Sequence, residues 1–344
     1  MKQNSYVKIS NDLHPQWESF KMFYSNLNIP DELDFKIVDE ILKFNKEIGS
    51  IDMGGAWRFY NENTRRDYTT ALHNGDRDVL ANLFSSLFQN ECSSAIITPS
   101  INKVKDFNLS NQMCWDLDAL AEFSDLEYDY PILNASNVGA PFGVEVNGNK
   151  ILPDSARHLF FAEKVKYLAE KKNQNILEIG GGYGGLAYFL NKLNFKNTYF
   201  NIDLPETLFI CYYYLRKNKI NCEFLTNVKK IKKGVFYLIP SIDYEKIVRN
   251  IEFGVFFNSA SLSEMDKKIA FNYIEMINKK QPKYILHCNS NYLAFPNSKI
   301  HIEILAKNFP INKKSYELVY KYISPFQGAS GRYRIFLYKS KQTR

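Results

Sequence analysis

Apolar residues recur at two spacings along the chain, and the change between them divides it into two parts. Within 31–48 and within 76–89 they recur every three or four positions, which predicts two amphipathic helices. From residue 175 onward, short apolar runs alternate with helical patterns, as is typical of a parallel sheet covered by helices. The predicted strands are 175–179, 198–202, 222–226, 253–258 and 283–288, and the predicted helices are 184–193, 206–218, 241–250, 263–278 and 298–308. Residues 235–239 are also strand-like, so the pattern does not decide the secondary structure between the third and fourth predicted strands.

A turn sequence separates the two parts. Asn147-Gly148-Asn149 joins the apolar stretches 142–146 and 150–152, and an Asn-Gly pair favours a tight β-hairpin. A helix capped by Asp154 or Ser155 should then run to about Glu170. We therefore expect a helical N-terminal cap or substrate domain at 1–136, a hairpin and linking helix at 137–172, and a cofactor domain at 173–344.

The chain also ends in a hairpin pattern. The stretches 316–323 and 333–339 are strand-like, and only nine residues separate them. No crossover helix fits in so short a connection, so this pair should be antiparallel.

Charge is distributed unevenly between the parts. Residues 1–150 carry 13 Lys and Arg against 22 Asp and Glu, whereas residues 151–344 carry 31 against 15, within an overall charge of +7. Opposite charges favour docking of the two parts. The basic part would also attract a phosphate-bearing substrate, although a solvated lysine surface has the same composition.

Composition excludes several classes of protein. With 45% apolar residues the chain can bury a large core, and five cysteines without a CxxC pair indicate buried thiols rather than disulfides or a zinc site. No run is long and apolar enough for a membrane helix, and the first residues do not resemble a signal peptide. We predict a cytoplasmic protein without an integral membrane segment and without a nucleic-acid partner; a homodimer remains open.

A glycine-rich turn carries the chemistry. The strand at 175–179 runs into it, and a helix follows. Backbone N–H groups at such a turn can meet a nucleotide ligand, and Asp203, at the end of the second strand, can accept hydrogen bonds from ribose hydroxyls. The candidate cofactor-binding residues are Glu178, Gly180, Gly181, Gly182, Tyr183, Gly184, Asp203 and Asn258. For Tyr183 and Asn258, the alternative to cofactor binding is that the side chain packs inside the protein.

Two cofactors fit this motif. Gly180, Gly182 and Gly185 satisfy the GxGxxG pattern of dinucleotide-binding enzymes. Glu178, two residues before the first glycine, favours S-adenosylmethionine (SAM), because its carboxylate suits a cationic sulfonium or ammonium and would repel a pyrophosphate. The terminal hairpin favours SAM as well.

These residues resemble a known family. Glu178-Ile-Gly-Gly-Gly-Tyr-Gly-Gly185, Asp203-Leu-Pro-Glu206 and Asn258-Ser-Ala-Ser-Leu-Ser-Glu-Met265 are similar to class I SAM-dependent methyltransferases, in particular the sugar O-methyltransferases that include the nanchangmycin-pathway enzyme. The resemblance covers roughly 137–339. It implies a Rossmann-like sheet of order 3-2-1-4-5-7-6 with strand 7 antiparallel, and a sugar or nucleotide-sugar acceptor.

Methyl transfer to a hydroxyl benefits from a general base near the end of the fourth strand. Glu264 is the first candidate; its structural alternative is that it caps the next helix or orients the chain. His158 and His287 are further candidates, each with an ordinary packed or surface histidine as the alternative. Asp203, Glu264 and a histidine do not form a closed ligand set, so we predict no required metal.

Two other functions remain open from the sequence. One is an NAD(P)-dependent oxidoreductase, which predicts a further strand pair in place of the terminal hairpin. The other is a non-catalytic binding module that keeps the nucleotide fold and serves glycan assembly.

Overall fold

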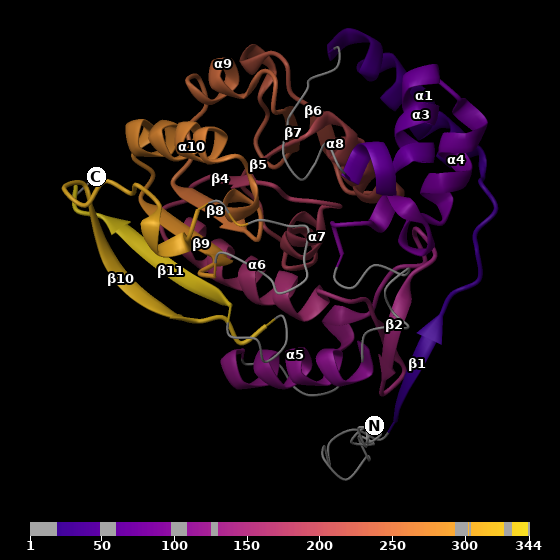
Figure 1. Cartoon of the computed structure of the whole chain (residues 1–344), viewed down its shortest axis with the longest axis horizontal. Helices are drawn as coiled ribbons and strands as arrows, with labels where there is room; N and C mark the ends of the chain where they lie inside the picture. Colours follow the sequence, from indigo (N-terminus) through magenta and orange to yellow (C-terminus); the bar gives the residue numbers. More distant parts are fainter. Residues whose placement is uncertain are drawn as a thin grey trace.

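The computed structural model describes residues 19–48, 60–97, 109–124, 130–292, 302, 304–326 and 332–342. These residues contain an eight-stranded sheet of order β10-β11-β9-β8-β4-β5-β7-β6 (Figure 1). The strands are β4 Ile176–Ile179, β5 Tyr199–Asp203, β6 Cys222–Phe224, β7 Phe236–Pro240, β8 Val255–Ser259, β9 Tyr284–Ser290, β10 Tyr316–Ile323 and β11 Tyr333–Ser340. Strands β4 to β9 run parallel, and β11 is antiparallel to both of its neighbours. The α/β fold and the terminal antiparallel hairpin are therefore confirmed.

One strand assignment was wrong. The order β7-β5-β4-β8-β9-β11-β10 corresponds to 3-2-1-4-5-7-6, but its third strand is β7 and not the predicted 222–226. β6 instead forms an eighth strand at the edge. The five residues of β7 are all buried, as a strand covered on both faces requires, whereas β6 has only three residues and a partly exposed Glu223.

Helices cover both faces of the sheet (Figure 1). One hydrophobic cluster joins the sheet to α6 Ser155–Glu170, α7 Gly185–Lys192 and α8 Pro205–Lys217. A second cluster joins the opposite face to α9 Tyr244–Val248 and α10 Lys267–Lys280. No described helix has the length and apolar character that crossing a membrane requires.

The predicted helix at 298–308 is wrong over its described part. Only a 3₁₀ turn, η9 Ala306–Asn308, is present there. Ile302, Ile304 and Ala306 are all buried, and this spacing of two is that of an extended segment rather than a helix.

The N-terminal part combines helices with a small sheet. Its α-helices are α1 Glu32–Ile48, α3 Arg66–Asn74, α4 Arg77–Ser85 and α5 Leu109–Phe123. Shorter turns are η2 Tyr60–Thr64, η3 Leu87–Gln89, η4 Glu91–Ser93 and η6 Pro131–Leu133. The helix predicted to end at residue 89 therefore ends at Ser85 and is followed by a 3₁₀ turn.

The predicted Asn-Gly hairpin is present between β2 Phe142–Val146 and β3 Asn149–Ile151. Asn147 and Gly148 have φ values of 47° and 77°, as a tight hairpin turn requires. The strand β1 Phe20–Tyr24, which the sequence pattern did not predict, pairs antiparallel with β2. Asp154 precedes α6, but no side-chain capping bond is formed there.

Helices α1 and α8 form an interface between the acidic and basic parts. Lys217 on α8 lies 2.8 Å from Asp34 and 2.9 Å from Asp31, and the Tyr213 hydroxyl donates to Asp34. The hydrogen bond from Lys217 holds the pKa of Asp31 below its usual value. Ion pairs between an acidic helix of the first part and a basic residue of the second thus contribute to the contact between them.

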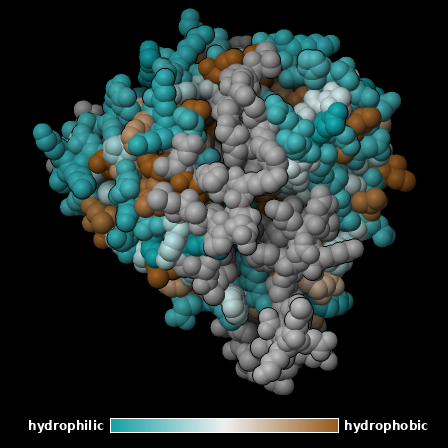
Figure 2. All heavy atoms as spheres, in the orientation of Figure 1, coloured by the Kyte–Doolittle hydropathy of each residue, from teal (hydrophilic) through white to brown (hydrophobic). Residues whose placement is uncertain are grey.

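The surface in Figure 2 is mostly hydrophilic where the described residues are visible, and its hydrophobic residues form small separate groups. All five cysteines are free and buried, as the sequence indicated.

Candidate functional site

A turn of five residues, 180–184, connects β4 to α7. Gly180, Gly182 and Gly184 have φ values of 75°, 58° and 91°, a region that favours glycine. The turn lies where the strand order reverses, because β5 pairs with one side of β4 and β8 with the other. Ligands of open α/β sheets bind at the carboxyl ends of the strands at such a point.

Four glycines in and beside the turn are required by packing within the protein. At each of them an added Cβ would approach a neighbouring side chain closer than 3.0 Å. The contacts would be 2.3 Å to Ser261 Oγ from Gly180, 2.6 Å to Asn201 Nδ2 from Gly181, 2.8 Å to Cys211 Sγ from Gly184 and 2.2 Å to His158 Nδ1 from Gly185. At these positions the missing side chain makes room for protein atoms rather than for a ligand.

Gly182 differs from the other four. An added Cβ would lie 3.7 Å from its nearest neighbour, Ile96, which comes from the N-terminal part. The Gly182 N–H donates to Asp203 Oδ2 at 3.0 Å. Gly182 therefore packs against Ile96 at ordinary contact distance, and its N–H joins the turn to Asp203.

Replacing Gly185 tests the packing argument. We expect Gly185→Ala to lower the free energy of unfolding by about 1–3 kcal/mol, because the methyl group would overlap His158 where α6 meets α7. Urea denaturation followed by circular dichroism measures this change. Asn191→Ala, at an exposed position on the same helix, is the control and should change the stability by less than about 0.5 kcal/mol. A fully stable Gly185→Ala protein would contradict the close contact.

Asp203 ends β5 and uses both carboxylate oxygens on backbone groups. Oδ2 accepts from Gly182 N, and Oδ1 accepts from Leu204 N at 2.8 Å. Burial raises the pKa of Asp203 to about 7, although the two backbone donors and the nearby Arg65 lower it. Each oxygen keeps a second lone pair, so the carboxylate can accept further hydrogen bonds from a ligand.

Glu178 lies on β4 and makes its contact inside the protein rather than in the turn. It is buried, and its Oε2 accepts a hydrogen bond from the Tyr199 hydroxyl on β5. Burial raises the pKa of Glu178 to about 8, so the group is mostly protonated at neutral pH. Its strand neighbour Asn201, which the sequence analysis missed, accepts from Gly181 N at 3.1 Å.

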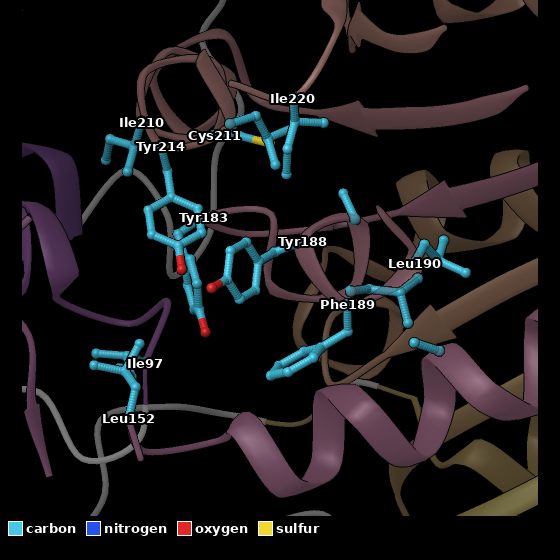
Figure 3. Close-up of a cluster of buried hydrophobic side chains, with 14 of the residues drawn as sticks. Ile97, Leu152, Tyr183, Tyr188, Phe189, Leu190, Ile210, Cys211, Tyr214 and Ile220 are labelled. Carbon is cyan, nitrogen blue, oxygen red and sulfur yellow. The ribbon is translucent and has the colours of Figure 1, made fainter. Parts of the chain in front are cut away.

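Asn258 and Tyr183 make their contacts inside the protein. Asn258 is fully buried, and it donates to Ile179 O at 2.8 Å and accepts from Asn289 Nδ2 at 2.7 Å. Tyr183 is also buried, and its ring packs against Tyr214 (Figure 3). Both residues thus hold the surroundings of the turn, which is the packing alternative considered for them.

His287 was expected to end the fifth strand, but β9 continues to Ser290. Its ring is buried and stacks on Phe336 at 4.7 Å between centroids, and neither ring nitrogen has a partner among the described residues. Burial lowers the pKa of His287 to about 3, so the ring is neutral. The structure therefore places His287 in an apolar slot away from the predicted cleft.

His158 lies at the junction of α6 with the glycine turn. Its Nδ1 is 3.2 Å from the Tyr183 hydroxyl. Burial lowers the pKa of His158 well below its usual value, so it is a neutral packing contact for Gly185 in this arrangement.

Glu264 follows β8 in the 3₁₀ turn η8 Leu262–Glu264. Its Oε1 accepts a hydrogen bond of 3.2 Å from the hydroxyl of Tyr333, the first residue of β11. Burial raises the pKa of Glu264 to about 7. The next helix, α10, is capped by Asp266, which accepts from Lys268 N and Ile269 N, so the capping alternative for Glu264 is wrong.

Arg157 on α6 is a further buried polar group, which the sequence analysis missed. Its side chain is 9% exposed, lies 3.1 Å from Asp154 and donates to Ser259 Oγ at 3.3 Å. Its Nε is buried without a hydrogen-bond partner among the described residues. The charge of Arg157 also lowers the pKa of Glu264, whereas burial raises it. No sequence signal marked Arg157 or Tyr333, because they come from distant segments.

Within the described ranges, no three His, Cys, Asp or Glu side chains are grouped so that they could hold a metal ion.

Comparison with solved structures finds similar folds. The chain is similar to the methyltransferase domain of bacterial CtHen1 (12% identity, TM-score 0.36, 52% of this chain and 97% of that one). It is also similar to a SAM-dependent methyltransferase from Clostridium acetobutylicum (10%, 0.35, 52% and 90%) and to magnesium protoporphyrin IX methyltransferase from Synechocystis with bound S-adenosylhomocysteine (9%, 0.36, 54% and 85%). All three are methyltransferases. No family model and no curated protein matches the chain.

Proposed function

We propose that the protein is a SAM-dependent methyltransferase that transfers a methyl group to a hydroxyl of a sugar or nucleotide sugar. The observation that carries the first part is the antiparallel β11 inserted between β9 and β10. This is the strand order that the sequence resemblance implies, and the oxidoreductase alternative predicted a further strand pair there instead.

The residues present suit an adenosine-containing methyl donor. Asp203 offers a carboxylate for ribose hydroxyls beside the glycine turn. The buried Arg157 Nε would gain an acceptor from an anionic group, such as the α-carboxylate of the donor or an acidic group of the acceptor. When bound, SAM supplies a methyl group on a sulfonium.

Glu264 and Tyr333 are the groups that we assign to the acceptor. A carboxylate with a pKa of about 7 can take the proton of an attacking hydroxyl near neutral pH. Tyr333 orients the Glu264 carboxylate through the 3.2 Å hydrogen bond. The sugar assignment depends on the sequence resemblance, and the basic charge of 151–344 supports a phosphate-bearing form of the acceptor.

Isothermal titration calorimetry with SAM, S-adenosylhomocysteine (SAH) and NAD tests the cofactor. We expect SAM and SAH to bind and NAD not to bind. NAD binding without SAM binding would reject the proposal.

A screen of free, nucleotide-linked and lipid-linked sugars by mass spectrometry tests the acceptor. Methyl transfer is expected as a mass increase that requires SAM. SAM binding without transfer to any acceptor would favour the binding module.

A further inference from the structure

A buried arginine connects the N-terminal part to the candidate cofactor site. From the sequence, Trp57, Arg58, Arg65 and Arg66 could either contact a ligand or form surface beside a core; the first two lie outside the described residues. Arg65 is fully buried, and its Nε and Nη2 donate to the carbonyl oxygen of Ser94 at 3.0 and 2.6 Å. The neighbouring Arg66 is exposed.

The helix that follows Arg65 also contacts α8. The Tyr68 hydroxyl on α3 donates to the carbonyl oxygen of Glu206 at 2.6 Å, in the first turn of α8. The Tyr68 N–H donates to Glu91 Oε1 at 2.5 Å. Tyr68 thus links the first turn of α8, which begins shortly after Asp203, to the segment Glu91–Ile97.

That segment lies over the glycine turn. A Cβ added at Gly182 would lie in van der Waals contact with Ile96, at 3.7 Å, so Ile96 packs against the turn. Ile97 is buried in the same cluster as Tyr183 and Leu152 (Figure 3). The two hydrogen bonds to Ser94 therefore hold the wall that faces Gly182.

Arg65 also acts on the group that we assign to the ribose. Its positive charge interacts with the carboxylates of Asp203 and Glu206. In a buried site such a charge favours the ionised form of a nearby carboxylate.

We propose that Arg65 is a positioning residue for cofactor binding, which fixes the Ser94–Ile97 segment against Gly182, the residue whose N–H donates to Asp203. This inference rests on the proposed function. Asp203 also interacts with titratable groups on other elements. They are Glu206, Tyr199, Cys211, Glu178 and Tyr273.

The test compares Arg65→Met with Arg66→Met, which changes an exposed arginine next to it. The dissociation constant for SAH is measured by calorimetry from about pH 5.5 to about pH 8.5. Ribose hydroxyls bind the carboxylate form, so wild-type affinity should fall by up to about tenfold per pH unit below about pH 7. In Arg65→Met the Asp203 carboxyl loses a nearby positive charge that lowers its pKa, so this fall should begin at a higher pH, with weaker binding at neutral pH. Arg66→Met should follow the wild-type curve.

Arg65→Lys separates the two roles and remains informative if Arg65→Met does not fold. Lysine keeps the charge but lacks the fork that reaches Ser94 O twice, so the wild-type midpoint should be retained with several-fold weaker binding. An unchanged midpoint and affinity in Arg65→Met would overturn the inference, as would wild-type affinity in Arg65→Lys if Arg65→Met is unfolded. Absence of SAH binding by the wild type at every pH would instead reject the proposed function.

Discussion

Replacing Glu264 by Gln is expected to lower kcat by about 100-fold or more, because a general base contributes about 10² to 10⁴ to the rate. Glutamine has nearly the same shape and can still accept from Tyr333, but it cannot take a proton from the acceptor hydroxyl. The dissociation constant for SAH should stay near the wild-type value. The measurement is kcat at saturating SAM with the acceptor found in the sugar screen.

The pH dependence of kcat tests the role of Glu264 independently. The pKa of Glu264 is raised to about 7, so the wild-type kcat should fall as the pH drops below about 7 and the carboxylate becomes protonated. Glu264→Gln should lose this acid limb. Glu275→Gln, an exposed carboxylate on α10, is the matched control and should keep both the rate and the limb. A Glu264→Gln protein with wild-type kcat would remove Glu264 from catalysis.

Replacing Asp203 by Asn is expected to weaken SAH binding by about 10- to 100-fold, since hydrogen bonds to a charged group contribute about 1.5–3 kcal/mol. The amide loses the charge, and its NH₂ group must face either Gly182 N or Leu204 N, both of which donate. Residue 203 therefore loses one of its two backbone hydrogen bonds, either the one from Gly182 in the turn or the one from Leu204. Calorimetry with SAH measures the change.

Asp78→Asn, at an exposed position on α4, is the control and should leave SAH binding unchanged. Thermal unfolding should show that Asp203→Asn remains folded. Together with Glu264→Gln, this variant divides binding from turnover. If both variants lose binding and turnover equally, that division of roles is wrong.

The regular parts of the fold could be predicted because their signals are local. Strands β4, β5, β8 and β9 are apolar runs bounded by turn residues, and the Asn147-Gly148 hairpin is encoded by two adjacent residues. The position of β7 could not be predicted, because which apolar strand becomes central depends on how completely its neighbours bury it. The strand β1 was missed because its partner is more than 100 residues away in the sequence.

The candidate site shows the same difference between local signals and long-range contacts. Sequence alone determined the order of strand, glycine turn, helix and Asp203, because these residues are close together along the chain. Only the tertiary structure decided that Glu178 faces Tyr199, that His287 lies in an apolar slot, and that Arg65 is buried and donates to Ser94. Burial and charge interactions set these roles, and both depend on segments that meet only when the chain folds.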